Sequence, residues 1–159
     1  MNTCSELLGT SHPYTAGTMA NLAMAYRLKN SLSQARELNE ESRAVLINSL
    51  GENHPWTLGV TYNLAIDLRM GDLPQESSAL LEDTAERAGL TLGERHPMTL
   101  LSQLASSLER DPLHGKAHPR SARDEILSML AQTLGAQHRL TLTAHAGRCS
   151  VWTFDPLPI

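Results

Sequence analysis

The chain has 159 residues, with 13 Lys or Arg, 17 Asp or Glu and a formal net charge of −4. Such a mildly acidic chain is a poor candidate for sequence-independent nucleic-acid binding, which needs clustered Lys and Arg to neutralise phosphates. No run of about 18 apolar residues is present, which excludes a membrane-spanning helix of ordinary length. Cys4 and Cys149 are 145 positions apart, so we expect free thiols, which are typical of a cytoplasmic protein.

One phrase, Leu-Gly-x-x-His-Pro-x-Thr, recurs along the chain. It begins at Leu8, Leu50 and Leu92, and it returns at Leu134 with Arg in place of Pro, so the period is 42 residues each time. A fixed period of this size is the signature of a stacked repeat array. Such arrays are binding scaffolds far more often than enzymes, because stacking creates a long, curved surface.

In chain order, the first unit is predicted at about residues 9–50 and the second at 51–92. Each unit contains two helical patterns with apolar residues at i, i+3, i+4 and i+7. The first helix of each unit begins at the proline after His, a residue that suits the first helical position. The second helices are expected at about 33–50 and 74–90.

Helix ends are marked by residues that can take the left-handed conformation. Asn30 and Gly71 stand in the breaks between the two helices of the first and second units. Gly51 and Gly93 follow the second helices, and we expect a positive φ at both.

The third unit, predicted at 93–134, departs from the pattern. Its Gln103-Leu104-Ala105 triplet lies two residues closer to the phrase than the matching triplets, and a Pro- and Gly-containing loop follows at 111–119. Beyond a second helix from about 121 to 134, a single capping helix is expected at 141–152 and a Pro-rich tail at 153–159. Residues 4–8 align with 46–50, so the sequence is expected to begin inside a repeat of a longer array.

The recurring residues resemble those of tetratricopeptide repeats. These residues are Asn-Leu-Ala at 21–23 and 63–65, a small residue at Ala35 and Ser77, and the phrase at each join. The 42-residue spacing is similar to the kinesin-light-chain subtype. This resemblance implies an all-α right-handed superhelix of stacked antiparallel helix pairs, about seven helices in all, over residues 1–152.

The phrase also resembles tetratricopeptide proteins of actinobacteria. The ending, which contains Arg148-Cys149 and Asp155-Pro156-Leu157-Pro158, is similar to a tetratricopeptide protein of an FxSxx-COOH peptide system.

The resemblance further implies a concave groove for a bound peptide. Asn21 and Asn63 match the family position whose amide binds the peptide, and Gln103 stands at the third such position. The arginines one and a half turns further on could neutralise an acidic side chain or C-terminus by a charge-assisted hydrogen bond. These arginines are Arg27 and Arg69. Met24, Tyr62 and Ile66 would give the groove an apolar floor. The alternative is that the asparagines only bond a neighbouring helix.

The four phased histidines invite a metal or catalytic interpretation. Equivalent residues of consecutive repeats lie on the order of 10 Å apart, whereas ligands of one zinc ion sit about 2 Å from it. We therefore predict a capping role before the first helices, with His54 as the example. A cluster of His114, His118 and either Cys149 or His138 has no paired ligand pattern. No catalytic residue, metal or cofactor is predicted.

The predicted function is a non-catalytic protein–protein interaction scaffold that binds a peptide segment in its concave groove. The alternative is a regulatory sensor tail of a larger nucleotide-switch protein of the NB-ARC or STAND type. The expected partner is a protein or peptide, with no nucleic acid and no membrane.

Overall fold

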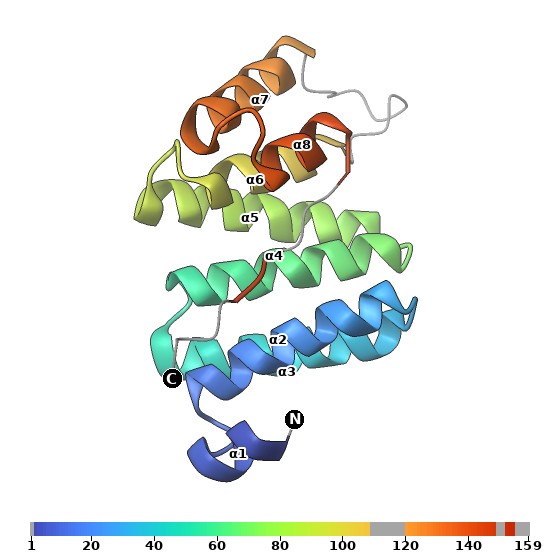
Figure 1. Cartoon of the computed structure of the whole chain (residues 1–159), viewed down its shortest axis with the longest axis vertical. Coiled ribbons are helices and arrows are strands. Elements are labelled where there is room, and N and C mark those ends of the chain that lie inside the picture. The colour runs from blue at the N-terminus through green and yellow to red at the C-terminus, as the bar shows by residue number, and fades with distance from the viewer. Residues whose placement is uncertain (1, 109–119, 149–151, 155–159) are drawn as a thin grey trace. The chain divides into compact units, whose positions relative to one another are not determined.

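The computed structural model describes residues 2–108, 120–148 and 152–154. Every regular element in this part of the chain is a helix (Figure 1). There are eight rather than about seven, because residues at the start form a short helix of their own. The helices are α1 (Asn2–Leu8), α2 (Pro13–Leu28), α3 (Leu32–Leu50), α4 (Pro55–Met70), α5 (Pro74–Leu92), α6 (Pro97–Leu108), α7 (Arg120–Leu134) and α8 (Arg139–His145). The predicted all-α class is confirmed for these residues. None of the helices they form is both long enough and apolar enough to cross a membrane.

The chain divides into two compact units. The first comprises Met1–Leu73 with Val151–Ile159, and the second comprises Pro74–Ser150. Helices α1–α4 therefore share a unit with the segment 152–154, and the division falls between the two helices of the predicted repeat 51–92.

In the first unit, α3 packs against both α2 and α4, and α2 also contacts α4. The connections at 29–31 and 51–54 are short, as expected for antiparallel neighbours in a helical stack. The core between these helices is formed by Ala16, Ala20, Leu46 and Val60, together with Phe154 from the end of the chain. In the second unit, α5 packs on α6, α6 on α7 and α7 on α8.

The glycine of the repeated phrase forms the turn between consecutive 42-residue repeats. Gly51 and Gly93 have φ of 89° and 98°, as predicted, and the other two glycines of the phrase, Gly9 and Gly135, have 87° and 95°. Side chains other than hydrogen are strained in that region. In the break between the two helices of the first repeat, Asn30 is left-handed, also as predicted, with φ of 61°.

The prediction for the break in the second unit was wrong by one residue. Gly71 has φ of −92°, and its N–H donates to the carbonyls of Asp67 and Leu68, so it closes the helix in a right-handed turn. The left-handed residue is Asp72, with φ of 60°, which lies 42 residues after Asn30. Short polar side chains tolerate this conformation, so the repeat preserves the position rather than the glycine.

The histidine and threonine of the phrase cap the following helix. Nδ1 of His54 accepts a hydrogen bond of 3.2 Å from the N–H of Trp56, and the Thr57 hydroxyl donates to the Gly51 carbonyl at 2.8 Å. The same histidine bond, also 3.2 Å, forms at His12, His96 and His138. An N-terminal helix turn has unsatisfied N–H groups, so the predicted capping role is confirmed.

The predicted capping helix at 141–152 was wrong at both ends. Helix α8 ends at His145, where Gly147 with φ of 69° and a bond from the Arg148 N–H to the Thr143 carbonyl terminate it. Trp152 is outside any helix, and Phe154 is buried in the first unit rather than lying in a free tail. The predicted loop at 111–119 with its histidines, Cys149 and residues 155–159 lie outside the described residues.

His96 makes the stability of the second unit depend on pH. Burial lowers the pKa of His96 below its usual value of 6.5, because desolvation disfavours the charged imidazolium. The unfolded chain therefore binds the proton more readily, so the stability from neutral His96 is present above pH 6.5 and is lost as the pH falls toward the folded-state pKa.

We expect the wild-type free energy of unfolding to fall more steeply between about pH 7 and pH 5 than that of His96→Asn. Asparagine keeps an oxygen that can cap the helix but does not titrate. Urea unfolding at a series of pH values measures the difference, and two parallel profiles would contradict the prediction.

Candidate functional site

Two asparagine side chains hold the main chain of the segment 152–154. The Asn63 amide nitrogen donates to the Trp152 carbonyl at 2.8 Å, and the Trp152 N–H donates to Oδ1 of Asn63 at 2.9 Å. In the same way, Asn21 bonds the carbonyl and the N–H of Phe154 at 2.7 and 3.1 Å. Alternate residues of an extended chain face the same side, so two asparagines grip one edge of the segment.

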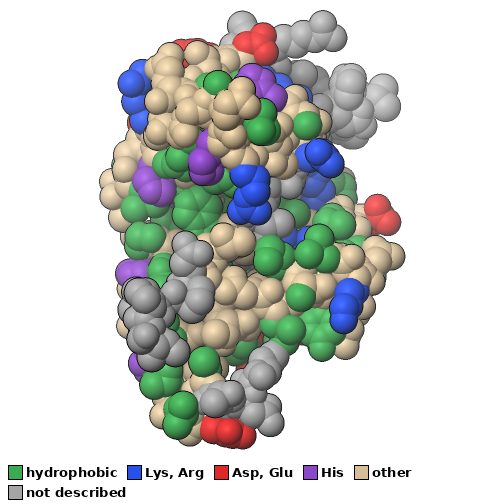
Figure 2. Space-filling model, viewed as in Figure 1, with side chains coloured by type: hydrophobic (Ala, Val, Ile, Leu, Met, Phe, Trp, Pro, Cys, Tyr) green, Lys and Arg blue, Asp and Glu red, His purple; other side chains and the backbone are tan. Residues whose placement is uncertain are grey.

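The two asparagines occupy equivalent positions of α2 and α4, which lie side by side. Figure 1 shows the segment 152–154, drawn in red, in front of α4. On the face of the first unit that Figure 2 shows, most of the surface is hydrophobic side chains or backbone and other uncharged side chains, with few charged ones.

One turn before each asparagine stands a buried glycine, Gly17 on α2 and Gly59 on α4. A methyl group at Gly59 would lie 2.6 Å from Cδ1 of Trp152 and 3.1 Å from Cζ of Phe154. At Gly17 it would meet only ordinary contacts, 3.5 Å from Trp56 and 3.7 Å from Cβ of Phe154. The indole of Trp152 therefore rests directly on the backbone of α4, which only glycine permits.

Aromatic side chains enclose the segment on its apolar side. Phe154 is 6% exposed, and its ring meets the edge of Trp56 with centroids 5.8 Å apart. Trp56 contacts Tyr14 in turn at 5.3 Å. Phe154 thus completes the core that α2, α3 and α4 form beneath it, while Trp152 packs at the margin of that core.

A buried ion pair braces the two helices below the asparagines. Nε of Arg27 on α2 lies 2.5 Å from Oδ1 of Asp67 on α4, and the two side chains are 5% and 0% exposed. Arg27 also donates to the Asn63 carbonyl at 2.9 Å, and Asn39 of α3 donates to the other oxygen of Asp67 at 2.5 Å. The predicted role of Arg27 as an anchor for an acidic ligand was wrong, because an internal carboxylate already neutralises it.

The other predicted groove residues are distributed as follows. Tyr62 and Ile66 are 1% and 3% exposed, and Met24 and Arg69 are half-buried. Gln103 lies on α6, in the second compact unit.

The structure corrects the match of Gln103 to the asparagines. Helix α6 continues unbroken from Pro97, so the residue six positions after Thr99, as Asn63 is after Thr57, is Ala105. Two residues correspond to a rotation of about 200° around a helix, which turns Gln103 toward another side. The position equivalent to Gly59 is Leu101, so the glycine–asparagine pair occurs only in the first two units.

Sequence reasoning missed Trp152 and Phe154. Composition contained a signal: the chain has only one Phe and two Trp, and the Phe and one Trp lie in its last eight residues. A disordered tail seldom contains such residues, since its composition is poor in aromatics.

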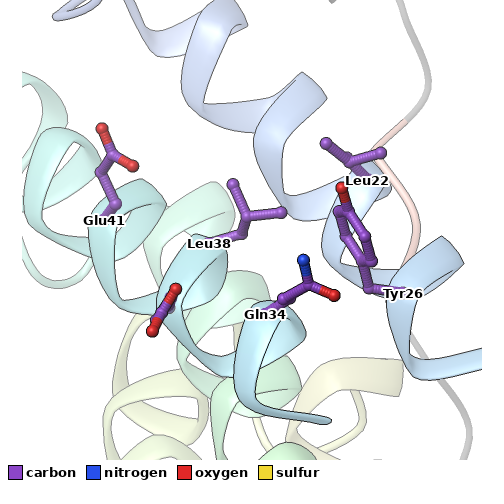
Figure 3. Close-up of a pocket in the computed structure, with 6 residues that line it drawn as sticks. Leu22, Tyr26, Gln34, Leu38 and Glu41 are labelled. Carbon is purple, nitrogen blue, oxygen red and sulfur yellow. The ribbon is translucent and has the colours of Figure 1, made fainter. Parts of the chain in front are cut away.

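A second concavity in the first unit lies between α2 and α3 (Figure 3). It is an open hollow of about 280 Å³, with apolar and polar walls formed by Leu22, Tyr26, Gln34, Glu37, Leu38 and Glu41. The hollow has no pair of asparagines spaced to hold a main chain, so the groove with Asn21 and Asn63 is the candidate site. Among the described residues, no group of three or more His, Cys, Asp or Glu side chains could hold a metal ion.

Comparisons with known proteins agree with this architecture. Residues 15–55 match the family model of the tetratricopeptide repeat, and no curated protein matches the sequence. Two similar solved structures are from Podosopora anserina, and both are described as a kinesin light chain with nearly identical TPR-like repeats. One, a variant, is 25% identical with a TM-score of 0.65 and covers 82% of this chain. The other is 23% identical with a TM-score of 0.62 and covers 86%.

The chain spans only 61% and 64% of the length of these two structures. The similarity to an actinobacterial peptide system stays a prediction from the sequence. Residues 15–55 are therefore similar to a tetratricopeptide repeat, and the chain has the fold of kinesin-light-chain-like tetratricopeptide arrays.

Proposed function

We propose that the groove over α2 and α4 binds an extended peptide segment of a protein partner, and that the chain is a non-catalytic interaction scaffold. The observation that carries this proposal is the paired bonding of Asn21 and Asn63 to alternate main-chain residues. An asparagine amide places a donating NH₂ group beside an accepting oxygen, a pair that matches the C=O and N–H of a single residue.

This mode of binding resembles the addition of a strand to a sheet edge, in which main-chain bonds supply affinity and alternate side chains supply specificity. Stacked repeat arrays are used mainly as binding surfaces, which agrees with the fold. The proposed location is the cytoplasm, as expected from the sequence. The alternative of a sensor tail from a nucleotide-switch protein stays a prediction.

A displayed library of random peptides, selected on the full chain carrying Trp152→Ala and Phe154→Ala, tests the proposal. We expect selected peptides to bind Asn21→Ala/Asn63→Ala at least about tenfold more weakly. Each side chain contributes two hydrogen bonds of about 0.5–1.5 kcal/mol, and about 1.4 kcal/mol corresponds to a factor of ten. The protein with the two asparagine substitutions and the protein without them both carry Trp152→Ala and Phe154→Ala, because the same amides otherwise hold residues 152–154.

Asn48→Ala is the matched control, because Asn48 is an exposed asparagine on α3. Its substitution should leave peptide affinity unchanged. Melting temperatures of all variants show whether each sample is folded. Equal affinity of selected peptides for the double asparagine variant and the control would rule out this groove as the binding site.

A further inference from the structure

The segment 152–154 uses the bonding groups that a bound peptide would need. Both polar atoms of the Asn21 amide and both of the Asn63 amide are engaged by Phe154 and Trp152. A second peptide in the same register would need the positions beside these amides that the main chain of Trp152 and Phe154 already occupies. Binding of the segment and binding of another peptide at the two amides therefore exclude each other.

The groove also selects side chains at two positions of the segment. The side chain of Trp152, the residue that Asn63 holds, lies against the backbone at Gly59, because a methyl group placed there would be 2.6 Å from its Cδ1. The side chain at the Asn21 grip is buried beside Trp56, among Ala16, Ala20 and Val60. A planar residue suits the first position and a large apolar residue suits the second, because close packing there excludes water.

We infer that this groove recognises extended segments with aromatic side chains at alternate positions, and that residues 152–154 are an intramolecular copy of such a segment. The inference rests on the proposed function and adds the chemistry of the ligand and a built-in competitor. A partner segment must displace Trp152 and Phe154 before it can bond Asn21 and Asn63.

The strength of the competition follows from the covalent link. The competing segment belongs to the same chain as the groove, and a short tether corresponds to an effective concentration in the millimolar range. A free peptide of the same sequence with a dissociation constant of roughly 0.1 mM would then appear about tenfold weaker on the intact chain.

The test uses a fluorescein-labelled synthetic peptide with the sequence of residues 150–156 and the full chain in three forms. These are the wild type, Trp152→Ala/Phe154→Ala, and Thr153→Ala as the matched control, since Thr153 lies between the two gripped residues. Fluorescence anisotropy should show about tenfold tighter binding to the double variant than to the wild type or the control. Adding Asn21→Ala and Asn63→Ala to the double variant should abolish the gain.

The peptide could bind all three forms equally and lose binding when Asn21 and Asn63 are replaced. That result would overturn the inference that residues 152–154 compete for the groove, and it would leave the proposed function standing. Absence of binding to every form would overturn this inference, since the segment would then be a fixed part of the fold, while the peptide library remains the test of the proposed function. If the double variant melts, Trp152→Ala alone must still give an intermediate gain, because it leaves the Phe154 contact in place. A dimer that requires Trp152 would place the segment in a second copy and overturn the intramolecular assignment.

Discussion

Replacement of Asp67 by alanine is expected to lower the free energy of unfolding by about 3–5 kcal/mol. The substitution leaves the Arg27 guanidinium buried with no carboxylate, and Nη1 of Arg27 has no hydrogen-bond partner even with Asp67 present. It also removes the acceptor for Asn39. An unpaired buried charge is costly because the protein interior solvates it poorly. Helices α2, α3 and α4 all lose a shared contact, so the whole first unit should be affected.

Asp83→Ala is the matched control for this prediction. Asp83 pairs with Arg87 at 2.9 Å one turn apart on α5, where the two side chains are 45% and 34% exposed. Exposed pairs of this kind contribute about 0.3–0.5 kcal/mol. Urea unfolding of both variants measures the contrast, and a loss at Asp67 no larger than at Asp83 would show that the buried pair adds nothing to stability.

The two buried glycines should respond to alanine in opposite ways. Gly17→Ala should stabilise the chain by about 0.5–1 kcal/mol, because alanine is the better helix former and its methyl group meets only ordinary contacts. Gly59→Ala has the same helical advantage but forces the Trp152 indole away from α4. The rigid ring must move as a whole, which loosens the bonds to Asn63 as well.

Digestion of the C-terminus by carboxypeptidase, compared among wild type, Gly17→Ala and Gly59→Ala, measures this loosening. When opening is fast, cleavage follows the population of the released segment. A loss of about 1.4 kcal/mol in segment binding raises that population tenfold, so we expect at least tenfold faster digestion of Gly59→Ala. Similar rates for the two alanine variants would mean that the indole is not held against Gly59.

Much of the fold could be predicted because its signals are local. Gly51, His54 and Thr57 lie within seven residues and together form one turn and one helix cap. The same phrase therefore marks the same helix start each time it recurs. The end of α8 was missed because Gly147 outweighs the apolar pattern that continues beyond it.

The site was predictable only in part. Asn21 and Asn63 stand out because they interrupt an apolar pattern at equivalent positions, and the family resemblance assigns them to a groove. The pairing of Arg27 with Asp67 joins residues 40 apart on different repeats, and no periodic pattern specifies which carboxylate meets which arginine. The occupant of the groove was hidden for the same reason, since Phe154 lies 133 residues from Asn21.

That separation sets an order of events during synthesis. Helices α2, α3 and α4 pack on their neighbours in sequence, so their groove is complete once about the first 70 residues have emerged. The segment that fills it is made more than 80 residues later, which at ordinary elongation rates is on the order of ten seconds. During that interval the amides of Asn21 and Asn63 on a nascent chain have neither Phe154 nor Trp152 to bond.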